Sequence, residues 1–137
     1  MTEAYVTSQK VEEACFKTPL RVQLMDEWEN GRPVWRLLSP LVFESFEQQC
    51  RITVETGYDT DLASVPRLPV ASIAMGLANK AAVIHDALYE FKLLPKDKAD
   101  LIFLEAMTVD NIPLRHAMYA AVSAFGGAIY NPEFSGW

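Results

Sequence analysis

The sequence contains only two cysteines, Cys15 and Cys50, among 137 residues. They do not form a CxxC pair, and a zinc site made only of thiolates is excluded because it needs more cysteines. We expect both to be free thiols, since cytosolic chains rarely keep disulfides. The N-terminus lacks a basic region followed by an apolar run, so we expect no Sec signal peptide and synthesis in the cytoplasm without export by that route.

The sequence also lacks an apolar run of the roughly 18 residues that a membrane span requires, and it has no block of like charge that would indicate a tail. Acidic residues outnumber basic ones by 18 to 12, which gives a formal net charge of −6. Because phosphate binding needs clustered Lys and Arg, we expect no nucleic-acid partner. Half of the residues are hydrophobic, which is enough for the core of a single domain over residues 1–137.

The first half of the chain has the patterns of β-strands. Residues 20–25 alternate apolar and polar side chains, and residues 34–38 form the expected return strand after the hairpin signal Asn30-Gly31. Residues 41–46 and 50–55 form a second expected pair. The sequence therefore predicts a small antiparallel meander of about four strands.

The second half has apolar residues at the spacings of three and four that indicate helices. We expect a first helix over residues 81–91 with Asn79 as its N-cap, a second helix that Pro95 begins and a third that Pro113 begins. Strands followed by helices indicate an α+β fold in which the three helices pack on one face of the sheet.

Three further segments have weaker patterns. Residues 1–18 predict a frayed helix or an N-terminal arm. Residues 57–71 are rich in turn-forming residues and predict a long loop, and long loops in compact domains are often functional. Residues 128–137 predict an aromatic strap that packs on the body or on a partner. Its aromatic side chains, which are candidates for binding a partner, are Tyr130, Phe134 and Trp137.

Ionisable residues within apolar or turn-forming sequence are the candidates for a functional site. Asp59 and Asp61 lie two apart, so both carboxylates can point to one side of an extended segment and hold a metal, or they can form Asx turns. His85 and Asp86 are consecutive and therefore point about 100° apart on a helix. His85 shares the apolar side of its helix, where it either pins the loop by a hydrogen bond to Asp59 or Asp61 or takes part in metal or acid–base chemistry.

These residues support two hypotheses about the site. In the first, a polar network locks the loop 57–71 onto the helices; its members are Asp61, Ser64, Arg67, His85, Asp86 and Asp100. In this network the expected partners of Asp100 are Arg67, Lys98 or a backbone group. In the second, a divalent metal, the only cofactor that the sequence suggests, has as its candidate ligands Asp59, Asp61, His85 and Asp86. The candidates for catalysis are then His85, Asp86 and Asp61.

Several common catalytic patterns are absent from the sequence. It has no GxSxG elbow, no phosphate-cradling loop and no dinucleotide-binding fingerprint. The His-Asp dipeptide of metal-dependent phosphohydrolases requires an earlier histidine, whereas the other histidine here, His116, comes later. We therefore reject the phosphohydrolase interpretation.

Two motifs carry a resemblance to a known family. They are Thr60-Asp61-Leu62-Ala63-Ser64-Val65-Pro66-Arg67 and His85-Asp86-Ala87-Leu88-Tyr89. With these motifs in this order, the chain resembles the phage and prophage family known as domain of unknown function 1353, over about residues 16–127. It departs from that family at Ser123 and Lys98, where a basic residue and an arginine are frequent. The resemblance implies a phage or prophage origin and brings no established activity or cofactor.

The sequence thus leads to three hypotheses about function. The first is a virion-associated or tail and baseplate assembly component, made in the host cytoplasm, that docks onto other phage proteins. The second is a metal-dependent hydrolase directed at the cell wall. The third is an inhibitor that binds a host protein.

Overall fold

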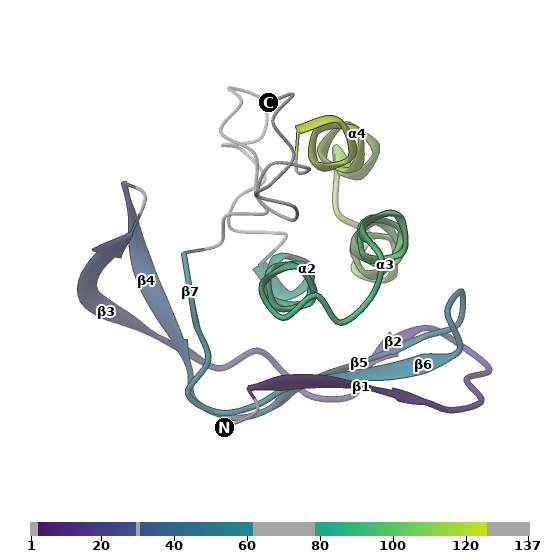
Figure 1. The fold of residues 1–137 in the computed structure, drawn as a ribbon, viewed down its shortest axis with the longest axis horizontal. Helices are drawn as coiled ribbons and strands as arrows, with labels where there is room; N and C mark the ends of the chain where they lie inside the picture. Colours follow the sequence, from purple (N-terminus) through teal and green to yellow (C-terminus); the bar gives the residue numbers. More distant parts are fainter. Residues whose placement is uncertain (1–2, 30, 62–78, 126–137) are drawn as a thin grey trace.

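The structure is a computed structural model, and it describes residues 3–29, 31–61 and 79–125 of the chain. In these residues seven strands precede three helices (Figure 1). The fold is therefore α+β, as the sequence predicts. Across the described ranges, none of the helices combines the length and the apolar composition needed to cross a membrane.

The larger sheet contains four antiparallel strands in the order β1-β6-β5-β2 (Figure 1). These strands are β1 (Ala4–Ser8), β2 (Cys15–Phe16), β5 (Leu41–Ser45) and β6 (Cys50–Val54). Side chains alternate between the two faces of a strand. The central strands β5 and β6 accordingly place Leu41, Phe43, Ile52 and Val54 on the face that the helices cover.

The frayed helix predicted for residues 1–18 is wrong, because the strands β1 and β2 lie in this range. Residues 4–8 form β1, which pairs with β6 from Ala4 opposite Val54 to Ser8 opposite Cys50. Their pattern is weak because Ala4 is the one deeply buried side chain of this edge strand. Pairing with a strand far along the chain is what makes them a strand, and a local pattern does not contain that information.

The smaller sheet contains three strands in the order β3-β4-β7. Its strands are β3 (Val22–Glu29), β4 (Arg32–Leu37) and β7 (Asp59–Thr60). Glu29 pairs with Arg32, so the turn falls where the hairpin signal predicts it, and Gly31 there has the left-handed φ of 75° that glycine accepts easily. Asn30 lies outside the described residues. The short strand β7 falls in the segment that the sequence predicts as a loop.

The helices are α2 (Asn79–Glu90), α3 (Lys96–Val109) and α4 (Arg115–Phe125). They lie on the same side of the larger sheet (Figure 1). Helices α2 and α3 contact the sheet directly, whereas α4 packs against α3. The predicted starts are displaced: Asn79 is already helical, Pro95 is the N-cap of α3, and α4 begins two residues after Pro113.

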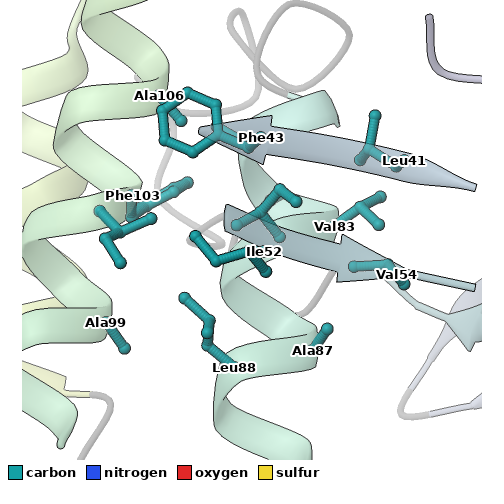
Figure 2. Packing of buried hydrophobic residues seen from close by; sticks show 14 of the residues in the cluster. Leu41, Phe43, Ile52, Val54, Val83, Ala87, Leu88, Ala99, Phe103 and Ala106 are labelled. Atoms are coloured by element: carbon teal, nitrogen blue, oxygen red, sulfur yellow. The ribbon is translucent and has the colours of Figure 1, made fainter. Parts of the chain in front are cut away.

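The core lies between the larger sheet and helices α2 and α3. Figure 2 shows strand side chains pointing toward apolar side chains of both helices. The contributing helix residues in this view are Val83, Ala87, Leu88, Ala99, Phe103 and Ala106. Each large apolar side chain buried in this way contributes on the order of 1.5–3 kcal/mol, so this interface is the main source of stability for the elements that hold the site.

Glu105 of α3 fastens the turn between β5 and β6. Its Oε1 accepts a hydrogen bond of 2.6 Å from Ser45 Oγ, and its Oε2 accepts bonds of 3.0 Å from the N–H groups of Phe46 and Glu47. One carboxylate thus satisfies three donors of a tight turn. The helix thereby fixes the far end of the sheet.

We expect Glu105→Gln to lower the free energy of unfolding by about 1–3 kcal/mol, because a neutral amide has one oxygen to offer in place of two charged ones. Urea unfolding followed by circular dichroism measures the change. Glu47→Gln is the matched control, since Glu47 is exposed and contributes only its backbone N–H to this contact. Equal effects of the two substitutions would contradict this role of Glu105.

Candidate functional site

Two ionisable side chains of the described residues, His85 of α2 and Asp100 of α3, are buried against each other. The side chain of each is 1% exposed. His85 lies on the face of α2 that also buries Ala81, Ala82 and Leu88. Asp100 follows Ala99 on the buried side of α3. The packing of the two helices therefore brings the imidazole and the carboxylate together inside the protein.

The Asp100 carboxylate accepts hydrogen bonds at both of its oxygens. His85 Nε2 lies 2.7 Å from Oδ1, and the Tyr89 hydroxyl also donates to Oδ1. Lys96 Nζ donates to Oδ2 at 2.7 Å. Because an ionised carboxylate can only accept, Nε2 of His85 carries the proton in this contact.

Aromatic rings fix the orientation of the His85 imidazole. It stacks on Phe103 with a ring-centroid distance of 4.6 Å and an interplanar angle of 26°. The imidazole also contacts the ring of Tyr89, and the two ring centroids are 4.1 Å apart. With its rotation restricted, the imidazole keeps Nε2 aimed at Asp100.

Lys96 connects this cluster to the end of α4. Its Nζ donates to the backbone carbonyl oxygens of Val122 at 3.3 Å and Ser123 at 3.0 Å. The last carbonyls of a helix lack intrahelical partners and carry partial negative charge, so an ammonium group is favourable there. A single side chain therefore links Asp100 on α3 to the C-terminal turn of α4.

Burial and hydrogen bonding act in opposite directions on the pKa of Asp100. Burial raises the pKa, whereas the hydrogen bonds from His85, Lys96 and Tyr89 lower it, and the net shift is downward. The carboxylate is thus held ionised in the interior, with the Lys96 ammonium as its counter-charge. An ionised carboxylate in such a place is stable only while its donors stay in position.

A second contact attaches β7 to α2. Thr60 Oγ1 donates to Asp86 Oδ2 at 2.7 Å. The neighbouring Asp59 instead forms a two-bond fork with Arg36 of β4, with distances of 2.8 Å and 2.9 Å. Alternation along the short strand explains the difference, because consecutive side chains point to opposite faces. Asp61, just beyond the strand, is buried.

Near this contact, burial raises the pKa of the Tyr58 hydroxyl and of the Glu90 carboxyl. For Glu90, the negative charge of Glu3 adds to the effect of burial. The Tyr58 hydroxyl donates to Glu90 at 3.5 Å. Glu90 is the last residue of α2 and lies one turn after Asp86, so this end of the helix is acidic.

The structure places the candidate residues of the sequence analysis in different environments. It brings together His85 and Asp100, and it joins Asp86 to Thr60 rather than to either. Asp59 is held by Arg36. Ser64 and Arg67, and likewise Tyr130, Phe134 and Trp137, lie outside the described residues, as does most of the loop 57–71.

No three His, Cys, Asp or Glu side chains are grouped closely enough to hold a metal ion within residues 3–29, 31–61 and 79–125. The four candidate ligands Asp59, Asp61, His85 and Asp86 all belong to these ranges. Both Asp59 oxygens are occupied by the guanidinium of Arg36. The described part of the chain therefore offers structural contacts for these side chains.

Sequence reasoning missed Tyr89 and Lys96 as members of the buried cluster. Tyr89 is four residues after His85, and Lys96 is four residues before Asp100. Residues four apart share one face of a helix, so this spacing was a usable signal. Lys98, which the sequence analysis considered as a partner of Asp100, is only two residues away and is exposed.

Comparison with known proteins gives one match. The model of the family described as "Protein of unknown function (DUF1353)" matches residues 35–122, which is more than half of the chain. These residues include the second half of β4, the strands β5 to β7 and most of the helical half, and therefore the whole His85–Asp100 cluster. No curated protein and no solved structure matches the chain.

We expect His85→Ala to lower the free energy of unfolding by about 2–4 kcal/mol, because it leaves a cavity and removes a donor from a buried carboxylate. Urea unfolding monitored by circular dichroism measures it. His116→Ala is the matched control: His116 is exposed on α4, and its loss should change stability by at most about 0.5 kcal/mol. A wild-type stability for His85→Ala would exclude a structural role for this contact.

We expect Asp100→Asn to make the free energy of unfolding less dependent on pH at acidic pH. The folded-state pKa of Asp100 lies below its ordinary value of 3.8. Its contribution is therefore present above the unfolded pKa and is lost as the pH falls through the folded pKa. The stability difference between wild type and Asp100→Asn should shrink as the pH falls below about 4.

Thermal unfolding at a series of pH values tests this dependence on Asp100. Asp97→Asn, an exposed position on the same helix, serves as the control and should follow the wild type. A difference between wild type and Asp100→Asn that does not vary with pH would show that the ionised carboxylate contributes nothing.

Proposed function

The chain belongs to the DUF1353 family, whose function is not known, and we propose that it is a docking component that assembles with other proteins of a phage particle. The proposal depends on the hairpin of β3 and β4, residues Val22–Glu29 and Arg32–Leu37, which we call the ribbon. The ribbon stands apart from the three helices (Figure 1). It carries the apolar surface that a docking component needs.

The single observation that supports docking most strongly is the exposure of Trp28 and Leu24. Trp28 is 68% exposed and Leu24 is 54% exposed, more than any other large hydrophobic residue in the described chain. Tryptophan is among the residue types that most often dominate the binding energy of interfaces. Apolar side chains placed together on a projecting element are typical of a surface that a partner covers.

The described contacts of the candidate site also favour docking over chemistry. His85, Asp100 and Lys96 connect the three helices, and Thr60 with Asp86 attaches β7 to α2. Each of these bonds joins two elements of the fold. The cluster therefore acts as an internal fastening that keeps the body rigid while the ribbon meets a partner.

The described residues give no specific support to the metal-dependent hydrolase hypothesis. Its candidate ligands Asp59 and Asp86 are engaged by Arg36 and Thr60, and His85 lies inside the protein against Phe103. A nucleophile or a metal ligand for a large wall polymer has to be reachable by the substrate. No observation on the described residues favours that reaction specifically.

The phage setting derives from the resemblance of the two motifs at residues 60–67 and 85–89. In this proposal the chain is made in the host cytoplasm and joins the virion, its tail or its baseplate. An inhibitor of a host protein would use the same surface on a different partner. The identity of the protein bound at Trp28 therefore separates the two hypotheses.

Site-specific photo-crosslinking tests the proposal. A photoreactive phenylalanine analogue is placed at position 28, and at position 101 as the control, because Leu101 is also exposed but lies on α3. The variants are produced in the bacterial strain that carries the gene during phage induction. We expect the position-28 variant to crosslink to a protein of the same phage, and the chain to sediment with particles or assembly intermediates.

Two outcomes of this experiment would overturn the proposal. One is equal crosslinking from positions 28 and 101, which would mean that the ribbon contacts other proteins no more than α3 does. The other is a crosslink from position 28 to a host protein, with the chain absent from particles. Trp28→Ser provides a further check, since it should reduce incorporation while leaving the unfolding midpoint close to that of the wild type.

A further inference from the structure

The register of the ribbon gathers its apolar side chains on one face. Residues directly opposite each other in an antiparallel pair project to the same side. The pairs Val22 with Leu37, Leu24 with Trp35, and Trp28 with Pro33 therefore share a face, which we call the ribbon face. Its members are Val22, Leu24, Trp28, Pro33, Trp35 and Leu37.

The ribbon face runs from the core of the protein into water. Leu37 at one end is 1% exposed, and Val22 and Trp35 pack partly buried against the core. Exposure then rises through Leu24 to Trp28 near the turn. One end of the face is thus fixed by the body, and the other end presents its apolar side chains to solvent.

The edge of β3 is poorly suited to adding a strand from a partner. The register shifts between Leu24 and Trp28, so β3 carries extra residues there. Bulges, prolines and charged residues are the usual means of blocking edge-to-edge pairing. A partner is therefore expected to contact the side chains of the ribbon face instead of extending the sheet.

The charges around Trp28 define the partner further. Asp26, Glu27 and Glu29 are exposed on the same stretch of β3, and β3 contains no Lys or Arg. Glu27 and Glu29 flank Trp28 along the strand, so they project to the opposite face of the ribbon. On β4, Arg36 is held in the fork with Asp59, and Arg32 is buried. The outer half of the ribbon is therefore acidic and apolar together.

Resting on the proposed docking function, we infer that the outer half of the ribbon binds a segment of a partner protein that is rich in arginine and aliphatic residues. Guanidinium groups stack on tryptophan, so they match Trp28 on the ribbon face, and their positive charge is attracted by the acidic residues on this part of β3. A second copy of the chain is disfavoured because the same acidic residues would face each other, and nucleic acid is disfavoured by its own charge.

A peptide-binding measurement tests the inference. The probe is a short fluorescent peptide of alternating arginine and leucine, with alternating glutamate and leucine as its counterpart. We expect the arginine peptide to bind wild type and to weaken as salt is added, and the glutamate peptide not to bind. Binding should weaken about tenfold or more in Trp28→Ser, and likewise in a triple variant. The triple variant combines Asp26→Asn, Glu27→Gln and Glu29→Gln.

Matched controls separate the ribbon from general attraction to an acidic protein. The charge control combines Glu12→Gln, Glu13→Gln and Glu47→Gln, which removes as much exposed negative charge from other places. The apolar control is Phe46→Ser, at a side chain that is 50% exposed on another turn. Both controls should bind like wild type. Equal losses in the two triple variants, or no binding to wild type, would overturn the inference.

Two further readouts make the result specific. Nuclear magnetic resonance should show the indole N–H signal of Trp28 moving with added peptide more than that of Trp35. A peptide with methylated backbone nitrogens on one edge cannot extend a sheet. It should still bind as well as the original, because the contact is made by side chains of the ribbon face. Its failure to bind would overturn contact through the ribbon face. A crosslinked phage partner that lacks basic segments would overturn this inference and leave the docking function standing.

Discussion

The buried carboxylate of Asp100 is the interaction on which the arrangement of the helices depends. An ionised carboxylate inside a protein is tolerated only when its oxygens are fully supplied with donors. Two of those donors, His85 and Tyr89, come from α2. The third is Lys96, which lies on α3 with Asp100 and also reaches the end of α4. Apolar packing holds the helices together, whereas this charge restricts how they can rotate and slide, because any such movement leaves a buried group unsatisfied.

This constraint divides the described protein into two parts with different tasks. The larger sheet with α2 and α3 forms a closed body whose apolar side chains face inward (Figure 2). The ribbon shares one end of that core and has its opposite end in solvent. Thr60 and Asp86 link the two parts through β7. A stiff body that carries a projecting apolar element loses little conformational entropy when a partner binds, which favours affinity without a large interface.

Local patterns in the sequence explain why some features were predicted and others were missed. The spacing of Ala99, Ile102, Phe103 and Ala106 predicts α3 because helical periodicity is local information. The hairpin was predicted by its turn residues for the same reason. The strands β1, β2 and β7 were missed, since each exists through pairing with a distant segment. At the site, His85 and Asp100 were both selected as unusual buried charges. Their pairing was missed because it depends on how two helices pack.

The position of β1 in the sheet also sets an order of events during synthesis. The first strand has no neighbour in the larger sheet other than β6, which leaves the ribosome after four intervening strands. Until β6 has been synthesised, the segment that forms β1 is unpaired, and an unpaired apolar strand is prone to aggregation. Its weak hydrophobic pattern, with Ala4 as its one deeply buried residue, lowers the tendency of the unpaired segment to aggregate. The pairing of β1 with β6 is non-local, and non-local pairs form more slowly than a local hairpin such as that of β5 and β6.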